Sequence, residues 1–98
     1  PYIYQAGDFQ VVVEVQEDAE HPDRKTILGL LVGLEDTQGT QVHVWQADAL
    51  LTTVDIDELG NFVIPGLEPG TYELILSGPE VEIHIQDVEV TPRGRLSF

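Results

Sequence analysis

The chain has 98 residues, with 18 acidic against 4 basic side chains and a formal charge of −14 at pH 7. A hydrophobic share of 42% is too high for a disordered acidic tail, and the length allows one small domain with one core. Because lysine and arginine are so scarce, we expect no nucleic-acid partner, and the longest apolar run, residues 27–34, is too short for membrane insertion.

Alternation of apolar and polar residues dominates the first half of the chain and predicts β-strands. Residues 9–16 alternate with period two, and residues 17–25 are charged and predict an exposed loop. Residues 27–34 are nearly all apolar, which predicts a central strand buried on both faces. After a polar turn, residues 41–45 predict another strand. Only residues 47–51 have a composition that favours a short helix.

The second half continues the same pattern with clear turns between its segments. Strands are predicted at 52–56, 62–64, 72–76 and 81–85, with Val88 and Val90 continuing the last one after a phase shift, and turns at 57–61, 65–70 and 77–80. About seven short strands without an amphipathic helix predict an all-β protein. We expect an antiparallel β-sandwich, and a small closed barrel is the alternative.

Short apolar segments stand at both ends of the chain. They consist of Tyr2, Ile3 and Tyr4 at the start and of Leu96 and Phe98 at the finish. Each predicts an edge strand, which pairs either within its own sheet or with a second copy of the chain in a homodimer. Frayed ends are the third alternative.

The centre of the chain, residues 53–76, carries two turn signatures. The residues that define them are Asp57, Gly60 and Phe62 in the first, and Leu67, Pro69, Gly70 and Tyr72 in the second. This stretch resembles the carboxypeptidase regulatory-like domain, a transthyretin-like (prealbumin-like) β-sandwich related to the B-type repeats of collagen adhesins. The resemblance covers about residues 26–90. It implies a transthyretin-like Greek-key topology in which these turn and core residues define the fold.

The resemblance also implies a function without catalysis. Domains of this kind are accessory modules with a structural or protein-interaction role, attached to a neighbouring domain in a larger, often bacterial, protein at the cell surface, in secreted form or in the cytoplasm. Since the chain starts at Pro1 without a methionine, we expect residues 1–98 to be one domain cut from such a protein. The compartment and the partner stay open.

Motifs for catalysis or for a cofactor are missing from the sequence, so we expect neither an enzyme nor a bound cofactor. No serine lies in a nucleophile elbow, and the three histidines lack the spacing of a zinc site. Asp55, Asp57 and Glu58 resemble half of a calcium-binding loop, but Gly66 stands where a bidentate glutamate belongs. A capped β-turn is therefore the expectation here, and a weak calcium site is the alternative.

The single tryptophan is the strongest candidate for ligand binding. Trp45 is out of phase with the valines of its strand, so we expect it to face outward beside His43. An exposed indole is a stacking platform, which makes a carbohydrate- or small-ligand-binding module the alternative function. His43 and Trp45, together with Tyr2 and Tyr4 near the N-terminus, are the candidate residues of a ligand or partner surface.

Overall fold

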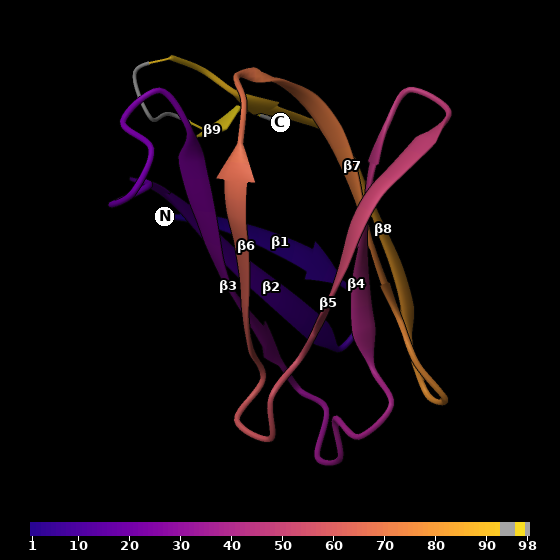
Figure 1. Ribbon diagram of the computed structural model, residues 1–98. Helices are drawn as coiled ribbons and strands as arrows, with labels where there is room; N and C mark the ends of the chain where they lie inside the picture. The colour runs from indigo at the N-terminus through magenta and orange to yellow at the C-terminus, as the bar shows by residue number, and fades with distance from the viewer. Residues whose placement is uncertain (93–95, 98) are drawn as a thin grey trace.

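The computed structural model describes residues 1–92 and 96–97, which form two antiparallel β-sheets packed face to face (Figure 1). The described residues contain no helix, and the all-β sandwich predicted from the sequence is confirmed. Arg93, Arg95 and Phe98, which enter the charge and end-strand predictions, lie outside the described residues.

A search of the described residues for a helix long and apolar enough to cross a membrane finds none.

The two sheets contain nine strands among the described residues. Sheet A has the order β1-β2-β3-β6 and is formed by β1 (Tyr2–Ala6), β2 (Phe9–Glu17), β3 (Lys25–Val32) and β6 (Asn61–Leu67). Sheet B has the order β5-β4-β7-β8-β9 and is formed by β4 (Gln41–Gln46), β5 (Ala49–Asp55), β7 (Gly70–Ser77), β8 (Glu82–Val90) and β9 (Leu96–Ser97). The chain crosses between the sheets after β3, β5 and β6.

β1 and β9, at the two ends of the chain, are the two strands beyond the seven predicted from the sequence. β1 pairs with β2 at one edge of sheet A, and β9 pairs with β8 at one edge of sheet B. Of the three alternatives for the end segments, the structure therefore shows an edge strand within the same chain.

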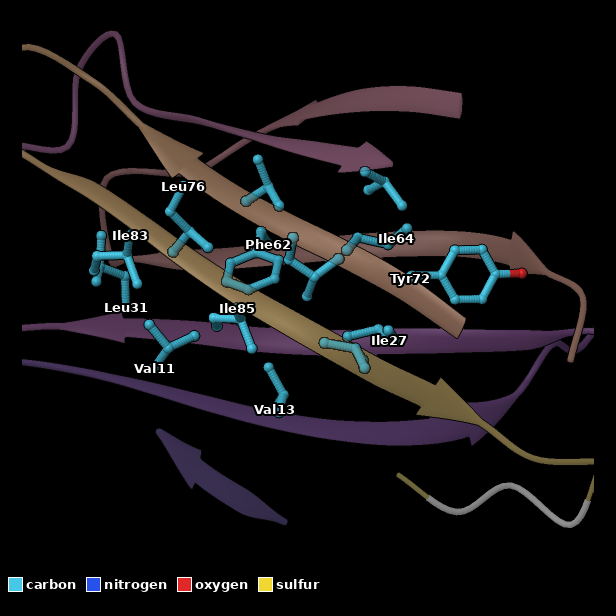
Figure 2. Packing of buried hydrophobic residues seen from close by; sticks show 14 of the residues in the cluster. Val11, Val13, Ile27, Leu31, Phe62, Ile64, Tyr72, Leu76, Ile83 and Ile85 are labelled. Carbon is cyan, nitrogen blue, oxygen red and sulfur yellow. The ribbon is translucent and has the colours of Figure 1, made fainter. Parts of the chain in front are cut away.

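The core lies between the sheets and is built by the predicted alternation. Its fully buried side chains come from both sheets and include Val11, Val13, Ile27, Val42, Val44, Ile64, Leu74, Leu76, Ile85, Val88 and Val90. Figure 2 shows Phe62 in the middle of this cluster and Tyr72 at one end. A slip of one residue in any strand would turn these side chains into water, so the alternation fixes the register.

Two glycines, Gly29 in sheet A and Gly60 in the turn before β6, are required by their surroundings. Gly29 of β3 pairs with Phe62 of β6, and the phenyl ring lies over the glycine, so that a Cβ at position 29 would overlap the ring. Gly60 has a φ of 93°, which favours glycine, and a Cβ there would collide with the carbonyl oxygen of Leu31. The turn at 57–61 and the first aromatic core residue after it are therefore as predicted.

The second predicted corner is also present. Tyr72 is buried, and its hydroxyl donates a hydrogen bond to the carbonyl oxygen of Glu68, as expected for a tyrosine that follows a Pro–Gly pair. Burial, and then the nearby Glu68 carboxylate, raise the pKa of the Tyr72 hydroxyl. The hydroxyl points away from the hydrophobic cluster, toward the end of the sandwich (Figure 2).

Three local predictions were wrong. The exposed loop predicted at residues 17–25 is shorter, because β2 ends at Glu17 and β3 begins at Lys25, which is buried. Residues 47–51 form no helix, because Ala47 and Asp48 are the turn of the β4–β5 hairpin and β5 begins at Ala49. Pro65 and Gly66 do not reverse the chain. They lie inside β6 at a bulge, where the register with β3 shifts, and proline is tolerated because β6 is an edge strand. The reversal is limited to residues 68–69.

The prediction for the central apolar run was half right. β3 lies between β2 and β6, and its inward side chains Ile27 and Leu31 are buried. On the opposite face Leu28 and Leu30 are only half-buried, and Val32 is 42% exposed. Within the described part of the chain, the second face of this strand therefore has no covering layer.

Candidate functional site

Trp45 lies on the outer face of sheet B, as its phase in the sequence predicts. It is half-buried near the end of β4, and it pairs across the sheet with Glu73 of β7. His43, two residues earlier on β4, faces the same side and pairs with Ile75. Side chains of paired residues point to the same face, so these four residues form one continuous surface.

A charged row extends this surface across β8. The Oε2 atom of Glu73 is 3.5 Å from Nδ1 of His84, and Oε2 of Glu82 is 2.9 Å from Nε2 of the same ring. The hydrogen bond to Glu82 is the main cause that raises the pKa of His84, and Glu73 adds to it. Both carboxylates therefore favour the protonated imidazolium.

The two histidines of sheet B do not form a pair. His84 and His43 both lie opposite Ile75, on either side of β7, so two strand spacings of roughly 4.8 Å each separate their backbones. The Nδ1 atom of His43 is 3.0 Å from the hydroxyl of Thr53 on β5. Among the described residues, no three histidine or acidic side chains are placed to hold a metal ion.

A shallow hollow of about 500 Å³ opens beside Trp45, and we call it the Trp45 hollow. Its lining is formed by Gln46, Ala47, Thr71, Tyr72, Glu73, Gln86 and Asp87. Two irregularities of sheet B adjoin it: the β4–β5 register shifts between Val44 and Trp45, and the β7–β8 register shifts between Tyr72 and Leu74. β-Bulges often redirect side chains next to functional sites.

Backbone conformation marks the same hollow. Ala47 has a φ of 52° and Asp87 a φ of 57°, and they are the two non-glycine positions with positive φ among the described residues. Both line the Trp45 hollow. Left-handed backbone costs free energy for a residue with a Cβ, more for alanine than for aspartate. Ala47 is the first residue of the two-residue β4–β5 turn and Asp87 lies in the bulge of β8, which are both places where a positive φ occurs.

A second candidate surface covers the outer side of sheet A. Its apolar side chains, which we call the outer apolar face, are Ile3, Val12, Leu28, Leu30, Val32 and Val63. They form an unbroken patch, because Ile3 pairs with Val12, Val12 pairs with Leu30, and Leu28 pairs with Val63. Ile3 is 58% and Val63 is 49% exposed.

This face is also poor in charge. Counting the outward positions of β1, β2, β3 and β6 in the described chain, Glu14 is the one charged side chain. A dent of about 170 Å³ in its middle is lined by Pro1, Val12, Glu14, Leu28, Gly29, Leu30 and Asn61. The face is therefore an apolar sheet surface with a single ionised group.

The predicted tyrosine surface is divided. Tyr2 and Tyr4 pair with Val13 and Val11, so they lie on the inward side of β1, on the opposite sheet from Trp45. The hydroxyl of Tyr4 is 3.4 Å from the carbonyl oxygen of His84, which links the edge of sheet A to sheet B. Tyr2 remains 39% exposed.

The acidic candidates at the β5–β6 turn have separate structural partners. The Oδ1 atom of Asp57 accepts hydrogen bonds from the backbone N–H groups of Leu59 (2.9 Å) and Asn61 (2.8 Å), which is a capped turn. Asp55 accepts a hydrogen bond from a glutamine amide of β4 at 2.9 Å. Glu58 lines a different hollow, against the β3–β4 connection. The structure does not bring the three carboxylates to one point.

Comparison with known protein families gives a match over residues 23–97 to Polysaccharide lyase family 4, domain II. The chain belongs to this family. The match spans β3 to β9, and therefore two of the four strands of sheet A and all of sheet B with the Trp45 hollow. It names a different family from the carboxypeptidase regulatory-like domain, and it supports the β-sandwich that both imply. A comparison with curated proteins and one with solved structures each found no match.

Sequence reasoning found Trp45 but missed most of the hollow beside it. Gln46, Thr71, Gln86 and Asp87 are polar residues without a motif, and strand pairing alone brings them together. One signal was present: the apolar phase shift after Ile85 marks the bulge that contains Gln86 and Asp87, which together oppose Glu73 of β7.

Proposed function

We propose that this domain is a non-catalytic accessory module of a polysaccharide lyase polypeptide, and that it docks on a neighbouring domain of that polypeptide through the outer apolar face. The family description supports the context, since a domain numbered II belongs with at least one other domain. The observation that carries the proposal is the uncovered apolar surface of β3 and its neighbours.

The physical driving force is the burial of apolar surface. Leu28, Leu30 and Val63 sit on paired strands, where a flat partner surface can cover them together. Burial contributes about 25 cal/mol for each Å² of apolar surface removed from water, and contiguous apolar patches on soluble proteins commonly mark interaction sites. The sequence of β3 predicts burial on both faces, and in such a complex the neighbouring domain covers the face of β3 that is otherwise exposed.

Charge favours this face over other parts of the surface. The chain carries 18 acidic residues, and docking elsewhere would remove carboxylates from water at a considerable cost. On the outer apolar face, Glu14 is the one described carboxylate that docking would remove from water. Pro1 lines the dent in the middle of this face, so a segment joined to Pro1 would reach the domain there.

Hydroxyl-radical footprinting tests the docking directly. We expect Leu28, Leu30 and Val63 to be oxidised readily in the 98-residue chain and protected in the longer polypeptide. Introducing a charge with Val63→Lys should restore the oxidation of Leu28 and Leu30 in the polypeptide and lower the temperature at which its domains unfold. The reason is that a lysine ammonium buried in the interface must lose its hydration.

Leu59→Lys is the matched control, because Leu59 is 75% exposed in the β5–β6 turn and is outside the outer apolar face. It adds the same charge and should leave the footprint unchanged. Equal oxidation of the face in the short chain and in the polypeptide would contradict the proposal. Protection already present in the 98-residue chain, with a dimer in sedimentation, would assign the face to a second copy instead.

A further inference from the structure

We propose that the Trp45 hollow binds a neutral saccharide, with Trp45 as the stacking platform and the polar side chains of the hollow as hydrogen-bond partners. The site lies on sheet B, on the opposite side of the sandwich from the outer apolar face. The inference therefore does not depend on the docking proposed above, and saccharide binding and docking can take place on one molecule.

The aromatic component comes from Trp45. Trp45 is not among the residues that line the hollow, but it pairs with Glu73 and precedes Gln46, both of which do, so it stands next to the hollow on the outer face of sheet B. A half-buried indole keeps part of its apolar surface in contact with solvent. Sugar rings carry C–H groups on their faces, which pack against such an aromatic surface at little conformational cost, since the indole is already held by its strand.

The polar lining has the chemistry that saccharide hydroxyls require. The amides of Gln46 and Gln86 each offer donors and an acceptor, the hydroxyl of Thr71 can do both, and Glu73 and Asp87 accept. A hydroxyl group donates one hydrogen bond and accepts others, so a mixed set of donors and acceptors matches it better than a purely acidic cluster. The hollow is open and shallow, which suits a segment of a chain better than an enclosed small molecule.

Charge selects neutral sugars over acidic ones. Glu73 and Asp87 line the hollow, and the whole chain has a formal charge of −14. Among the described residues, the imidazole of His84 lies beside Glu73, and it already contacts the carboxylates of Glu73 and Glu82 at 3.5 and 2.9 Å. A uronate carboxylate would enter a field of like charge, so we expect uncharged galactose, arabinose, xylose or glucose units to be preferred.

The geometry of the hollow is held by backbone that costs free energy. Ala47 and Asp87 keep a left-handed φ on two sides of the site, and neither has the freedom of glycine. Both residues adjoin a break in the ladder of sheet B, where the bulges turn Trp45 and Gln86 relative to a regular sheet. The turn and the bulge together therefore shape this end of the hollow.

Affinity gel electrophoresis provides the test, since the negative charge gives the chain a high mobility in a native gel. The 98-residue chain is run in gels that contain soluble galactan, arabinan, xylan or mixed-linkage glucan, and in a gel that contains polygalacturonate. We expect retardation by at least one of the neutral polymers and none by polygalacturonate. Because Trp45 is the single tryptophan, its fluorescence should shift on titration with oligosaccharides of the retarding polymer.

Two variants and a matched control assign the site. Trp45→Ala should weaken the retardation about two- to twelvefold, the range expected for the loss of one aromatic contact. Gln86→Ala should weaken it as well without altering the core, since Gln86 is exposed. Gln10→Ala is the control, because it removes the same side chain from the outer side of sheet A.

Three results would overturn the inference. The first is mobility unchanged in all four neutral polymers. The second is retardation by polygalacturonate as strong as by the neutral polymers. The third is retardation that Trp45→Ala and Gln86→Ala leave intact. Each of these results is independent of footprinting on the outer apolar face, so the failure of one proposal does not imply the failure of the other.

Discussion

The contact between Gly29 and Phe62 shows how a single residue fixes the packing of sheet A. The phenyl ring lies over the glycine on the paired strand, so each residue defines the space of the other. We expect Gly29→Ala to displace the ring and destabilise the domain by roughly 1–3 kcal/mol, the usual cost of overpacking a core. Urea unfolding of the two proteins measures the difference.

A double-mutant cycle separates this contact from a general effect of alanine in β3. In a Phe62→Leu background the ring is absent, and Gly29→Ala should then cost clearly less than in the parent chain. Equal costs in the two backgrounds would show that the Phe62 ring is not what excludes a side chain at position 29.

Residues of the turns were predicted more reliably than residues of the site. Gly60, Phe62 and Tyr72 occupy the predicted places because local chemistry decides them: a positive φ, a core position after the turn, and a hydroxyl that reaches the backbone. The outward position of Trp45 was predicted only from its place in the alternating pattern of its strand. Thr71 and Gln86 line one hollow from neighbouring strands and carry no local signal, so this hollow could not be derived from the sequence.

At the scale of elements, Asp18 joins the β2–β3 loop to the bulge of β6. Its Oδ1 atom accepts a hydrogen bond from the N–H of Glu20 at 2.9 Å, and its Oδ2 atom accepts one from the N–H of Gly66 at 3.1 Å. The Glu20 N–H is the main cause that lowers the pKa of Asp18, although partial burial opposes it; the N–H groups of His21 and Gly66 also contribute.

The sign of this pKa shift gives a pH-dependent prediction. A depressed pKa in the folded state means that Asp18 contributes its stability above its ordinary pKa of 3.8 and loses it as the pH falls through the lower folded value. Asp18→Asn should therefore lower the melting temperature at pH 7, and the difference from the parent should shrink toward about pH 2. Thermal unfolding followed by circular dichroism at both pH values measures it.

Asp23→Asn is the control within the same loop. It removes an equal charge from an exposed residue, so it should have a smaller effect on the melting temperature at pH 7. If both variants lowered the melting temperature equally, the hydrogen bonds of Asp18 would not be what secures the loop.

Elements were predicted correctly where one periodicity dominates, and incorrectly where pairing overrides composition. Residues 49–55 form a strand because they make backbone hydrogen bonds with β4. A helix of five residues would satisfy fewer backbone groups and would be marginally stable. Pro65 and Gly66 resemble a turn in sequence, yet the edge position of β6 accommodates them as a bulge. Neither outcome is contained in the local sequence, since both depend on the neighbouring strand.

At the scale of the whole molecule, negative charge opposes the compact fold. The described chain contains two cations of fixed charge, Arg24 and Lys25, and each has an acidic neighbour no nearer than 3.8 Å. Among the described residues, most of the 18 acidic side chains therefore have no lysine or arginine partner. The molecule measures 35 × 26 × 21 Å, so at 0.01 M salt, where screening acts over about 30 Å, nearly all its carboxylates repel one another.

Salt should consequently stabilise this domain. Raising NaCl from 0.01 to 0.15 M shortens the screening length to about 8 Å, which limits repulsion to close neighbours. If this relief amounts to 1 kcal/mol, the melting temperature at pH 7 rises by about 4–8 °C for a domain of this size. Near the isoelectric point of about 4.1 the net charge vanishes, and the same change in salt should have little effect. A melting temperature at pH 7 that stays constant or falls with NaCl would show that the folded chain is not under net electrostatic repulsion.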